Sequence, residues 1–250
     1  MMSKLKINNQ FIQRVYKRAI KEYRLLIQPK IIQIEGIKIK IGEHISPPVK
    51  KAMYIGEYES SELRAVKSKL STNDIVMELG AGIGLLSSYC AKRIGSERVF
   101  TYEANPRLEI PIRETYQINQ VLPNLEICLV GEENGEQTFY VGKNFWSSSI
   151  IPWNEGAKPI TVAVKSFNQE IRKINPSFLI IDIEGGEYDL LKYADFYNVK
   201  KLVIEIHPKA IGQDKAIFVK SKLAEMGFQI NHKLSKNSGI LEELFLERNN

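Results

Sequence analysis

The chain is poor in cysteine: only Cys90 and Cys128 occur among its 250 residues, and no Cys-x-x-Cys pair is present. This scarcity excludes a disulfide framework and a cysteine-based zinc site, so we expect two buried free thiols. No apolar run approaches the roughly eighteen residues of a membrane-spanning helix. The first ten residues also lack the apolar segment of a signal peptide. We therefore expect a cytoplasmic protein without a transmembrane segment.

Acidic residues are scarce in the first thirty positions, where eight lysines and arginines face a single acid, Glu22. The net charge of +6 therefore belongs to this segment, and the other 220 residues are close to neutral. A nearly neutral body is not the basic surface that binds nucleic acid, so we expect no nucleic-acid partner.

The basic segment has its own structural pattern. Apolar residues at helical spacing predict a helix that ends at Pro29, and alternating residues over 32–41 predict a hairpin. We assign residues 1–48 to this basic extension and residues 49–250 to the main domain. Two interpretations of the helix are open. Its apolar face packs on the main domain, or the helix contacts an anionic surface such as a membrane, a polyphosphate or an acidic partner.

Glycines cluster where a strand pattern changes into a helix pattern. Residues 75–77 form a short apolar run that predicts a buried strand, Glu78 follows, and Gly80, Gly82 and Gly84 occupy alternate positions. Apolar residues at helical spacing come next. A strand, a glycine loop and a helix in this order form nucleotide pockets, because glycine lets the backbone approach a ligand closely.

The ligand of this loop is not expected to be a dinucleotide. The fingerprint Gly-x-Gly-x-x-Gly needs Gly or Ala where Leu85 stands here, and Glu78 would repel a pyrophosphate. A carboxylate suits a ligand that carries an amino group and a sulfonium. The pattern Glu-x-Gly-x-Gly-x-Gly resembles motif I of class I S-adenosylmethionine-dependent methyltransferases. The resemblance implies S-adenosyl-L-methionine as the cofactor.

Beyond the loop, strand and helix patterns alternate. They predict an α/β fold with one doubly wound, Rossmann-like and mostly parallel sheet. The strand over residues 98–102 ends at Glu103, about twenty residues beyond the loop, where an acid accepts ribose hydroxyls in such folds. Residues 178–181 are the most apolar run, as expected for a central parallel strand. Residues 228–230 and 241–246 predict a closing antiparallel pair.

Two later motifs narrow the resemblance. Asp-Ile-Glu-Gly-Gly-Glu stands at residues 182–187, and Glu-Ile-His-Pro at residues 205–208. With the glycine loop and Glu-Ala-Asn-Pro at residues 103–106, they resemble the FkbM-type methyltransferase family over roughly residues 50–210. The resemblance implies methylation of a hydroxyl on a sugar, glycan or natural-product small molecule. The Asn-Pro-Pro-Tyr run of similar amino-methylating enzymes is absent, which favours oxygen as the acceptor.

The resemblance implies a set of cofactor-binding residues. Glu59 is expected at the amino acid end of the cofactor, Glu103 at the ribose, and the backbone of Ala104 and Asn105 at the adenine. Trp146 is a further candidate to cover the adenine or the substrate. The full candidate set is Glu59, Glu78, Gly80, Gly82, Gly84, Glu103, Ala104 and Asn105.

The candidate catalytic residues are Asp182, Glu184 and His207. Residues two apart share a face of an extended strand, and ligands of open α/β sheets bind beyond the carboxyl ends of the strands. His207 or Asp182 would take the proton of the acceptor hydroxyl, and Glu184 would orient it. We expect no metal, and a divalent metal held by these groups is the alternative. A nucleic-acid methyltransferase and a non-catalytic cofactor-binding protein are the alternative functions.

Overall fold

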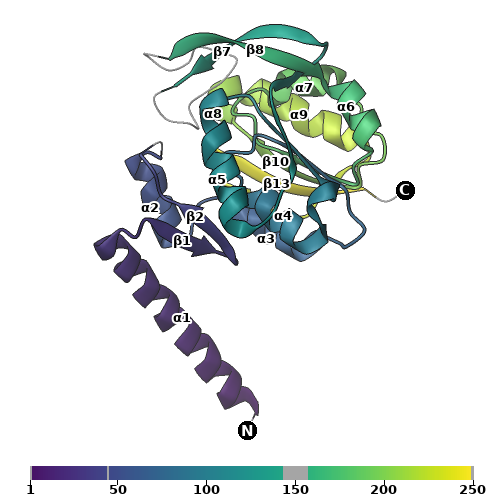
Figure 1. The fold of residues 1–250 in the computed structure, drawn as a ribbon. Helices are drawn as coiled ribbons and strands as arrows, with labels where there is room; N and C mark the ends of the chain where they lie inside the picture. Colours follow the sequence, from purple (N-terminus) through teal and green to yellow (C-terminus); the bar gives the residue numbers. More distant parts are fainter. Residues whose placement is uncertain (1, 44, 143–156, 249–250) are drawn as a thin grey trace.

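The computed structural model describes residues 2–43, 45–142 and 157–248. Its centre is a twisted, mostly parallel sheet flanked by helices (Figure 1). The strands run in the order β11 (Gln229–Ile230), β13 (Glu242–Glu247), β10 (Lys201–Ile206), β9 (Phe178–Ile181), β3 (Val76–Leu79), β4 (Val99–Glu103) and β5 (Asn124–Ile127), and the short β12 (Lys236–Asn237) pairs with β13.

The sheet confirms the predicted fold class. β9 lies between β3 and β10, pairs in parallel with both, and buries all four of its residues. A strand covered on both faces needs apolar side chains on both, which explains the continuous run Phe-Leu-Ile-Ile. β13 runs antiparallel to β10, so the predicted closing strand is confirmed as well.

Helices cover both faces of this sheet, because alternate strand residues point to opposite sides. Met77 and Leu79 pack with one group of helices, whereas Val76 packs with the other. The first group is α6 (Phe167–Ile174), α7 (Glu187–Tyr193), α8 (Pro208–Ile211) and α9 (Gln213–Glu225), and the second is α3 (Ser60–Lys69) and α4 (Leu85–Ile94). Short 3₁₀ turns η1 (Ser96–Arg98) and η2 (Pro106–Leu108) flank β4, and α5 (Glu109–Asn119) follows η2 and packs on α4.

A second, three-stranded sheet interrupts the alternation between β5 and α6. It consists of β6 (Leu129–Gly131), β8 (Lys158–Ser166) and β7 (Gly135–Val141), in that order. The apolar run over residues 125–130 does not form a single strand, because β5 ends at Ile127 and β6 leaves the main sheet to pair with β8. No turn residue marks that break in the sequence. Trp146 lies outside the described residues.

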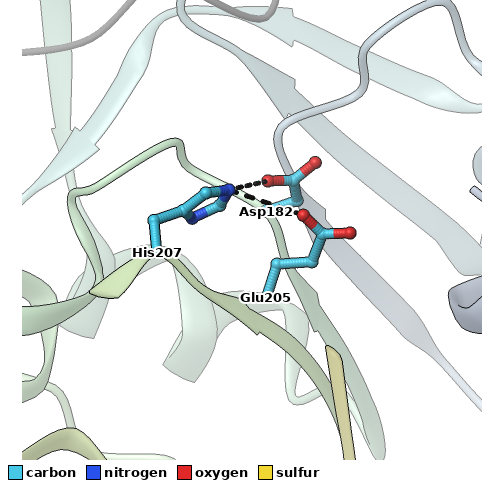
Figure 2. A group of neighbouring side chains, drawn as sticks. All are labelled: Asp182, Glu205 and His207. Carbon is cyan, nitrogen blue, oxygen red and sulfur yellow. Dashed lines mark ion pairs between the residues drawn. The ribbon is translucent and has the colours of Figure 1, made fainter. Parts of the chain in front are cut away.

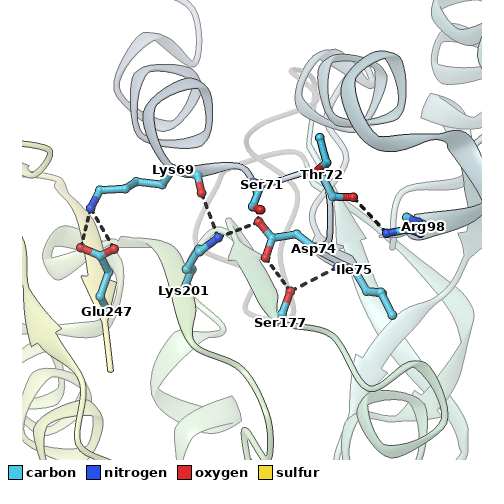
Figure 3. A network of polar contacts seen from close by, with 9 residues as sticks. All are labelled: Lys69, Ser71, Thr72, Asp74, Ile75, Arg98, Ser177, Lys201 and Glu247. Carbon is cyan, nitrogen blue, oxygen red and sulfur yellow. Dashed lines mark hydrogen bonds and ion pairs between the residues drawn. The ribbon is translucent and has the colours of Figure 1, made fainter. Parts of the chain in front are cut away.

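A polar network joins the amino ends of the central strands (Figure 3). Lys201 Nζ donates to Asp74 Oδ2, and Ser177 Oγ donates to Asp74 Oδ1, both at 2.7 Å. The three residues stand at or just before the starts of β10, β3 and β9. Asp74 is buried, and a buried charge is costly without a partner, so the network fixes the alignment of these strands at the edge remote from the glycine loop.

The hairpin of β1 (Ile31–Ile34) and β2 (Ile37–Lys40) belongs to the main hydrophobic core. Its inward isoleucines are buried with residues of α4, while its alternate residues face outward. The hairpin leads into α2 (Pro47–Ile55). Cys90 and Cys128 are free and buried, as predicted. Within the described part of the chain, no helix is long and apolar enough to cross a membrane.

Helix α1 (Met2–Ile27) extends away from this core (Figure 1). It contacts α2, and Arg24 Nη2 donates to the Gln33 carbonyl at 2.8 Å. Ile12, Val15 and Tyr16 are more than half exposed, so the interpretation that this apolar face packs on the main domain is wrong for these residues. The division of the chain at residue 48 stays a prediction.

Deletion of residues 1–29 is expected to leave the affinity for S-adenosylhomocysteine within about twofold, because distant sites are energetically independent. If α1 contacts an anionic surface, the same deletion should abolish binding to vesicles of anionic phospholipid, since the exposed Ile12, Tyr16 and Arg18 of α1 suit such a surface. Calorimetry and vesicle co-sedimentation measure the two properties. A folded truncated chain that no longer binds S-adenosylhomocysteine would contradict the first expectation.

Candidate functional site

A cavity of about 560 Å³ lies at the carboxyl ends of the central strands. Its size suits a small-molecule ligand, and residues of the second sheet, including Gln137 and Phe139, form part of its wall. Among the described residues, no Lys, Arg or His lines it, whereas ten acids do: Glu57, Glu59, Glu62, Glu103, Glu132, Asp182, Glu184, Asp189, Glu205 and Glu243. Clefts lined by one sign of charge attract ligands of the other sign, so this cavity favours a cation.

The glycine loop forms one wall of the cavity at very close range. Gly80 N donates to the Tyr102 carbonyl, and Asp182 N donates to the Leu79 carbonyl, both at 2.9 Å. A Cβ on Gly80 would stand 1.8 Å from the backbone oxygen of Asp182, which no side chain can tolerate. Glycine is required there by packing as well as by its φ of +89°.

Glu59 faces the loop from the start of α3. A Cβ on Gly82 would meet the Glu59 carboxylate at 3.3 Å. Glu59 itself has a left-handed φ of 46° and is the N-cap of α3. Its Oε2 is buried and accepts no hydrogen bond, and burial raises its pKa to about 8. A cationic donor at this position would satisfy the carboxylate.

Glu103 ends β4 on the other side of the loop. Its two carboxylate oxygens accept from Gly82 N at 3.1 Å and from Asn105 N at 2.8 Å. Burial raises its pKa to about 7, although these backbone donors oppose the rise. Ala104 lines the cavity next to it. The carboxylate is thus held rigidly at the edge where a ribose would bind.

Three of the predicted cofactor residues do not line the cavity and instead support the loop. Glu78 is buried and accepts from the Thr101 hydroxyl. Burial raises its pKa to about 7. Gly84 is the N-cap of α4 and approaches Tyr116. The side chain of Asn105 accepts from Arg107 N at 3.1 Å and caps η2. These three residues would therefore affect cofactor binding indirectly, through the structure around the loop.

Asp182 and His207 meet Glu205 at the carboxyl ends of β9 and β10 (Figure 2), and Glu184, the third predicted catalytic residue, lies beside them. His207 Nε2 is 3.9 Å from Asp182 Oδ1 and 3.4 Å from Glu184 Oε2. It also lies 3.5 Å from Glu205 Oε2. Glu184 takes a left-handed φ of 49°, followed by Gly185 at 100°, and this turn leaves both acids along the cavity wall. A non-glycine residue in that conformation is strained, and such strain concentrates at functional sites.

His207 lies behind the acids and does not line the cavity. Its Nδ1 is 2.8 Å from Oε1 of the fully buried Glu187. Burial alone lowers the pKa of His207, but its contacts with Glu187 and Glu205 raise it to about 12. An imidazolium cannot accept a proton, which favours Asp182 over His207 as the base. The role of His207 as a base stays a prediction, and its position also suits it to orient the surrounding carboxylates.

The predicted site lacked six acids of the cavity wall, Glu57, Glu62, Glu132, Asp189, Glu205 and Glu243, and also the buried Glu187. Glu205 stands two residues before His207 on the same strand, and that spacing was the available signal. Glu187 follows the two glycines of the motif and reaches back to Gly185 N at 2.9 Å. Glu62 and Glu243 come from α3 and β13, and no sequence pattern links them to the motifs.

The order of the seven main strands and the cavity beyond their carboxyl ends define a class I S-adenosylmethionine-dependent methyltransferase domain. Residues 78–230 match the Methyltransferase FkbM domain, which is more than half of the chain. The chain therefore belongs to the FkbM methyltransferase family, and its cofactor is S-adenosyl-L-methionine. The matched range is residues 78–230, whereas the resemblance covered roughly residues 50–210. The segment Gly56–Glu59, which includes the candidate cofactor residue Glu59, therefore lies outside the match.

Individual relatives are more distant. A Methanocaldococcus jannaschii protein named as a candidate protein N5-glutamine methyltransferase is 32% identical over 91 residues, 36% of this chain and 41% of that protein. The chain thus spans less than half of that relative's length. Similar solved structures include a ribosomal protein L11 methylase from Lactobacillus delbrueckii (15% identity, 78% of this chain and 80% of that one, TM-score 0.47). A Pyrococcus abyssi tRNA (uracil-54, C5)-methyltransferase in complex with S-adenosyl-L-homocysteine is similar at 13% identity (87% of this chain, 44% of that one, TM-score 0.49).

Substitution of Gly80 by alanine is expected to destabilise the protein by roughly 2–5 kcal/mol, from overpacking and left-handed strain together. Gly135→Ala is the matched control, since nothing lies within 4 Å of its added Cβ. Urea unfolding measures both. If Gly80→Ala matches the control in stability and in S-adenosylhomocysteine affinity, the close approach of the loop to Asp182 is not as described.

Cofactor affinity is expected to depend on the protonation of Glu103. A ribose hydroxyl donates to the carboxylate but not to a protonated oxygen, so with a pKa of about 7 affinity falls as the pH drops. Between pH 8 and pH 6 the loss should be about tenfold. Glu103→Gln should bind more weakly and lose this part of the pH dependence, while the exposed Glu136→Gln behaves as wild type. Identical pH profiles for wild type and Glu103→Gln would refute the assignment.

Proposed function

We propose that this chain transfers a methyl group from S-adenosylmethionine to a hydroxyl of a small molecule or glycan. The observation that carries the proposal is the position of Asp182 and Glu184, which line the same cavity as the glycine loop. The cavity suits the cofactor in charge, because its acids match a sulfonium and an ammonium. Its volume of about 560 Å³ is in the range of small-molecule sites, and Gly80 and Gly82 are both part of its wall.

The two acids have the properties of a base for an alcohol. S-adenosylmethionine supplies the methyl as an electrophile bound to positive sulfur. As the acceptor oxygen bonds to the methyl carbon, the carbon–sulfur bond breaks and its electron pair stays on sulfur. The hydroxyl proton must pass to a base. Burial raises the pKa of Asp182 well above its usual range, and burial raises that of Glu184 to about 8. A carboxylate with a pKa near the operating pH is a better base than an exposed one.

Asp182 is the better placed of the two. Its backbone N–H is bonded to the strand end at Leu79, which fixes it beside the glycine loop. Its Oδ1 is buried and accepts no hydrogen bond, so it can accept one from an acceptor hydroxyl. The carboxylate of Glu184, 3.4 Å from the His207 imidazolium, is held to orient the same group. Most of the rate enhancement then comes from positioning oxygen against the methyl group.

A second candidate acceptor is the side-chain amide of a protein glutamine. The match to the Methanocaldococcus jannaschii protein, whose name gives that reaction, favours it. Against it, residues 182–185 of this chain read Asp-Ile-Glu-Gly, where similar amino-methylating enzymes place Asn-Pro-Pro-Tyr. The acids of the cavity also disfavour a phosphate-bearing acceptor such as nucleic acid, because like charges repel at short range.

Asp182→Asn is expected to slow single-turnover methylation by roughly 10²-fold or more, because it removes the base without changing size. Affinity for S-adenosylhomocysteine should stay within about twofold, since positioning contacts to the cofactor remain. The assay uses cofactor with a labelled methyl group, and mass spectrometry identifies the product in saccharide, small-molecule and glutamine-peptide pools.

Glu136→Gln, an exposed change on β7, is the control for this assay. Label in an ether of a hydroxyl supports the proposal, and label on a glutamine nitrogen supports the second candidate. An Asp182→Asn variant that methylates at the parent rate would place the base elsewhere.

A further inference from the structure

Two glutamates face each other across the β10–β13 ladder at the cavity wall. Glu205 and Glu243 are register partners in this antiparallel pair, and both line the cavity. Like charges directly opposite one another destabilise a sheet. Helix α3 packs over this part of the ladder and brings Glu62 to the same place. Carboxylate oxygens of the three residues lie within 4.8 Å of one another.

Glu62 is the residue that makes this cluster unusual. It is only 3% exposed, and neither of its carboxylate oxygens accepts a hydrogen bond from the described residues. A buried carboxyl without a donor is destabilising, so its presence in the cavity wall indicates a partner that comes from outside the chain.

The positive charges nearby contact the other two acids, Glu205 and Glu243. His207 Nε2 is 3.5 Å from Glu205, and Lys236 Nζ is 3.5 Å from Glu243 at the exposed end of the cluster. No ion pair reaches Glu62 from any Lys, Arg or His in the described parts of the chain. The cluster therefore holds three carboxylates, and the buried one, Glu62, has no positively charged partner among the described residues.

We propose that Glu62, Glu205 and Glu243 bind a hard divalent cation such as Mg²⁺, Mn²⁺ or Ca²⁺. All three donors are carboxylate oxygens, which is the ligand type these ions prefer. Metal–oxygen distances of about 2.0–2.6 Å place the ligands of one ion roughly 3–5 Å apart, and the cluster has this spacing. The three acids come from α3, β10 and β13, so the site exists only in the folded chain.

The position of the site gives the ion a role that rests on the proposed function. The cluster opens into the cavity, and Glu205 also belongs to the group around Asp182 and His207 (Figure 2). An ion held by three protein oxygens keeps open positions for water or for hydroxyls of an acceptor. Coordination lowers the pKa of such a hydroxyl, and Asp182 is then placed to take its proton.

The test is manganese binding to the full chain, measured with MnCl₂ alone by electron paramagnetic resonance and calorimetry. We expect one site with a dissociation constant between about 10⁻⁵ and 10⁻³ M. Glu62→Gln should weaken binding about tenfold or more, because it removes one charged ligand. Glu132→Gln removes a cavity acid outside the cluster and should bind manganese as the wild type does.

Folding and cofactor binding are checked in the same samples. Glu62→Gln should melt no lower than the wild type without metal, because it removes a buried acid, but it should lose the rise in melting temperature that Mn²⁺ gives the wild type. S-adenosylhomocysteine binding reports separately on the methyltransferase function. Wild-type protein that binds no Mn²⁺ at millimolar concentration, or a Glu62→Gln variant that binds it equally well, would overturn the site.

Discussion

The contact between Gly80 and Asp182 is the constraint on which the site depends. The loop that leaves β3 passes so close to the end of β9 that any Cβ at Gly80 would overlap the Asp182 carbonyl. Hydrogen bonds from Gly80 N to β4 and from Asp182 N to β3 hold the three strand ends at this spacing. As a result, the loop wall of the cavity and Asp182 belong to one rigid unit, and rigid placement is what transfer chemistry needs.

The second organising feature is the concentration of negative charge in a cavity with no lining Lys, Arg or His among the described residues. Burial raises the pKa of Glu59 to about 8 and that of Glu103 to about 7, which means that the free protein holds protons its unfolded chain would release. Such an arrangement opposes stability and favours cationic ligands. His207, protonated and bonded to Glu187, offsets part of that charge from behind the wall.

Much of the fold could be predicted from local patterns in the amino-acid sequence. The glycine loop, the apolar run of β9 and the closing β13 each predicted their own place in the sheet, because periodicity and strand burial are local consequences of side-chain type. The break between β5 and β6 was not predictable, since the apolar run across Ile127 and Leu129 contains no turn residue. Pairing with β8, some thirty residues later, decides it. The exposure of the apolar face of α1 was not predictable either, because it depends on whether another part of the fold packs against it.

The sequence by itself determined the class of domain, the cofactor and the acids of the two strand-end motifs, because motif spacing on strands specifies which side chains share a face. Only the tertiary structure decided what those side chains do. The surroundings of His207, four carboxylates from three segments, raise its pKa and favour the imidazolium over the neutral base that the motif alone predicts. The pairing of Glu205 with Glu243 beneath Glu62 joins a strand motif to two segments with no motif at all. Charge interactions act through space, so their outcome is set by folding and not by order along the chain.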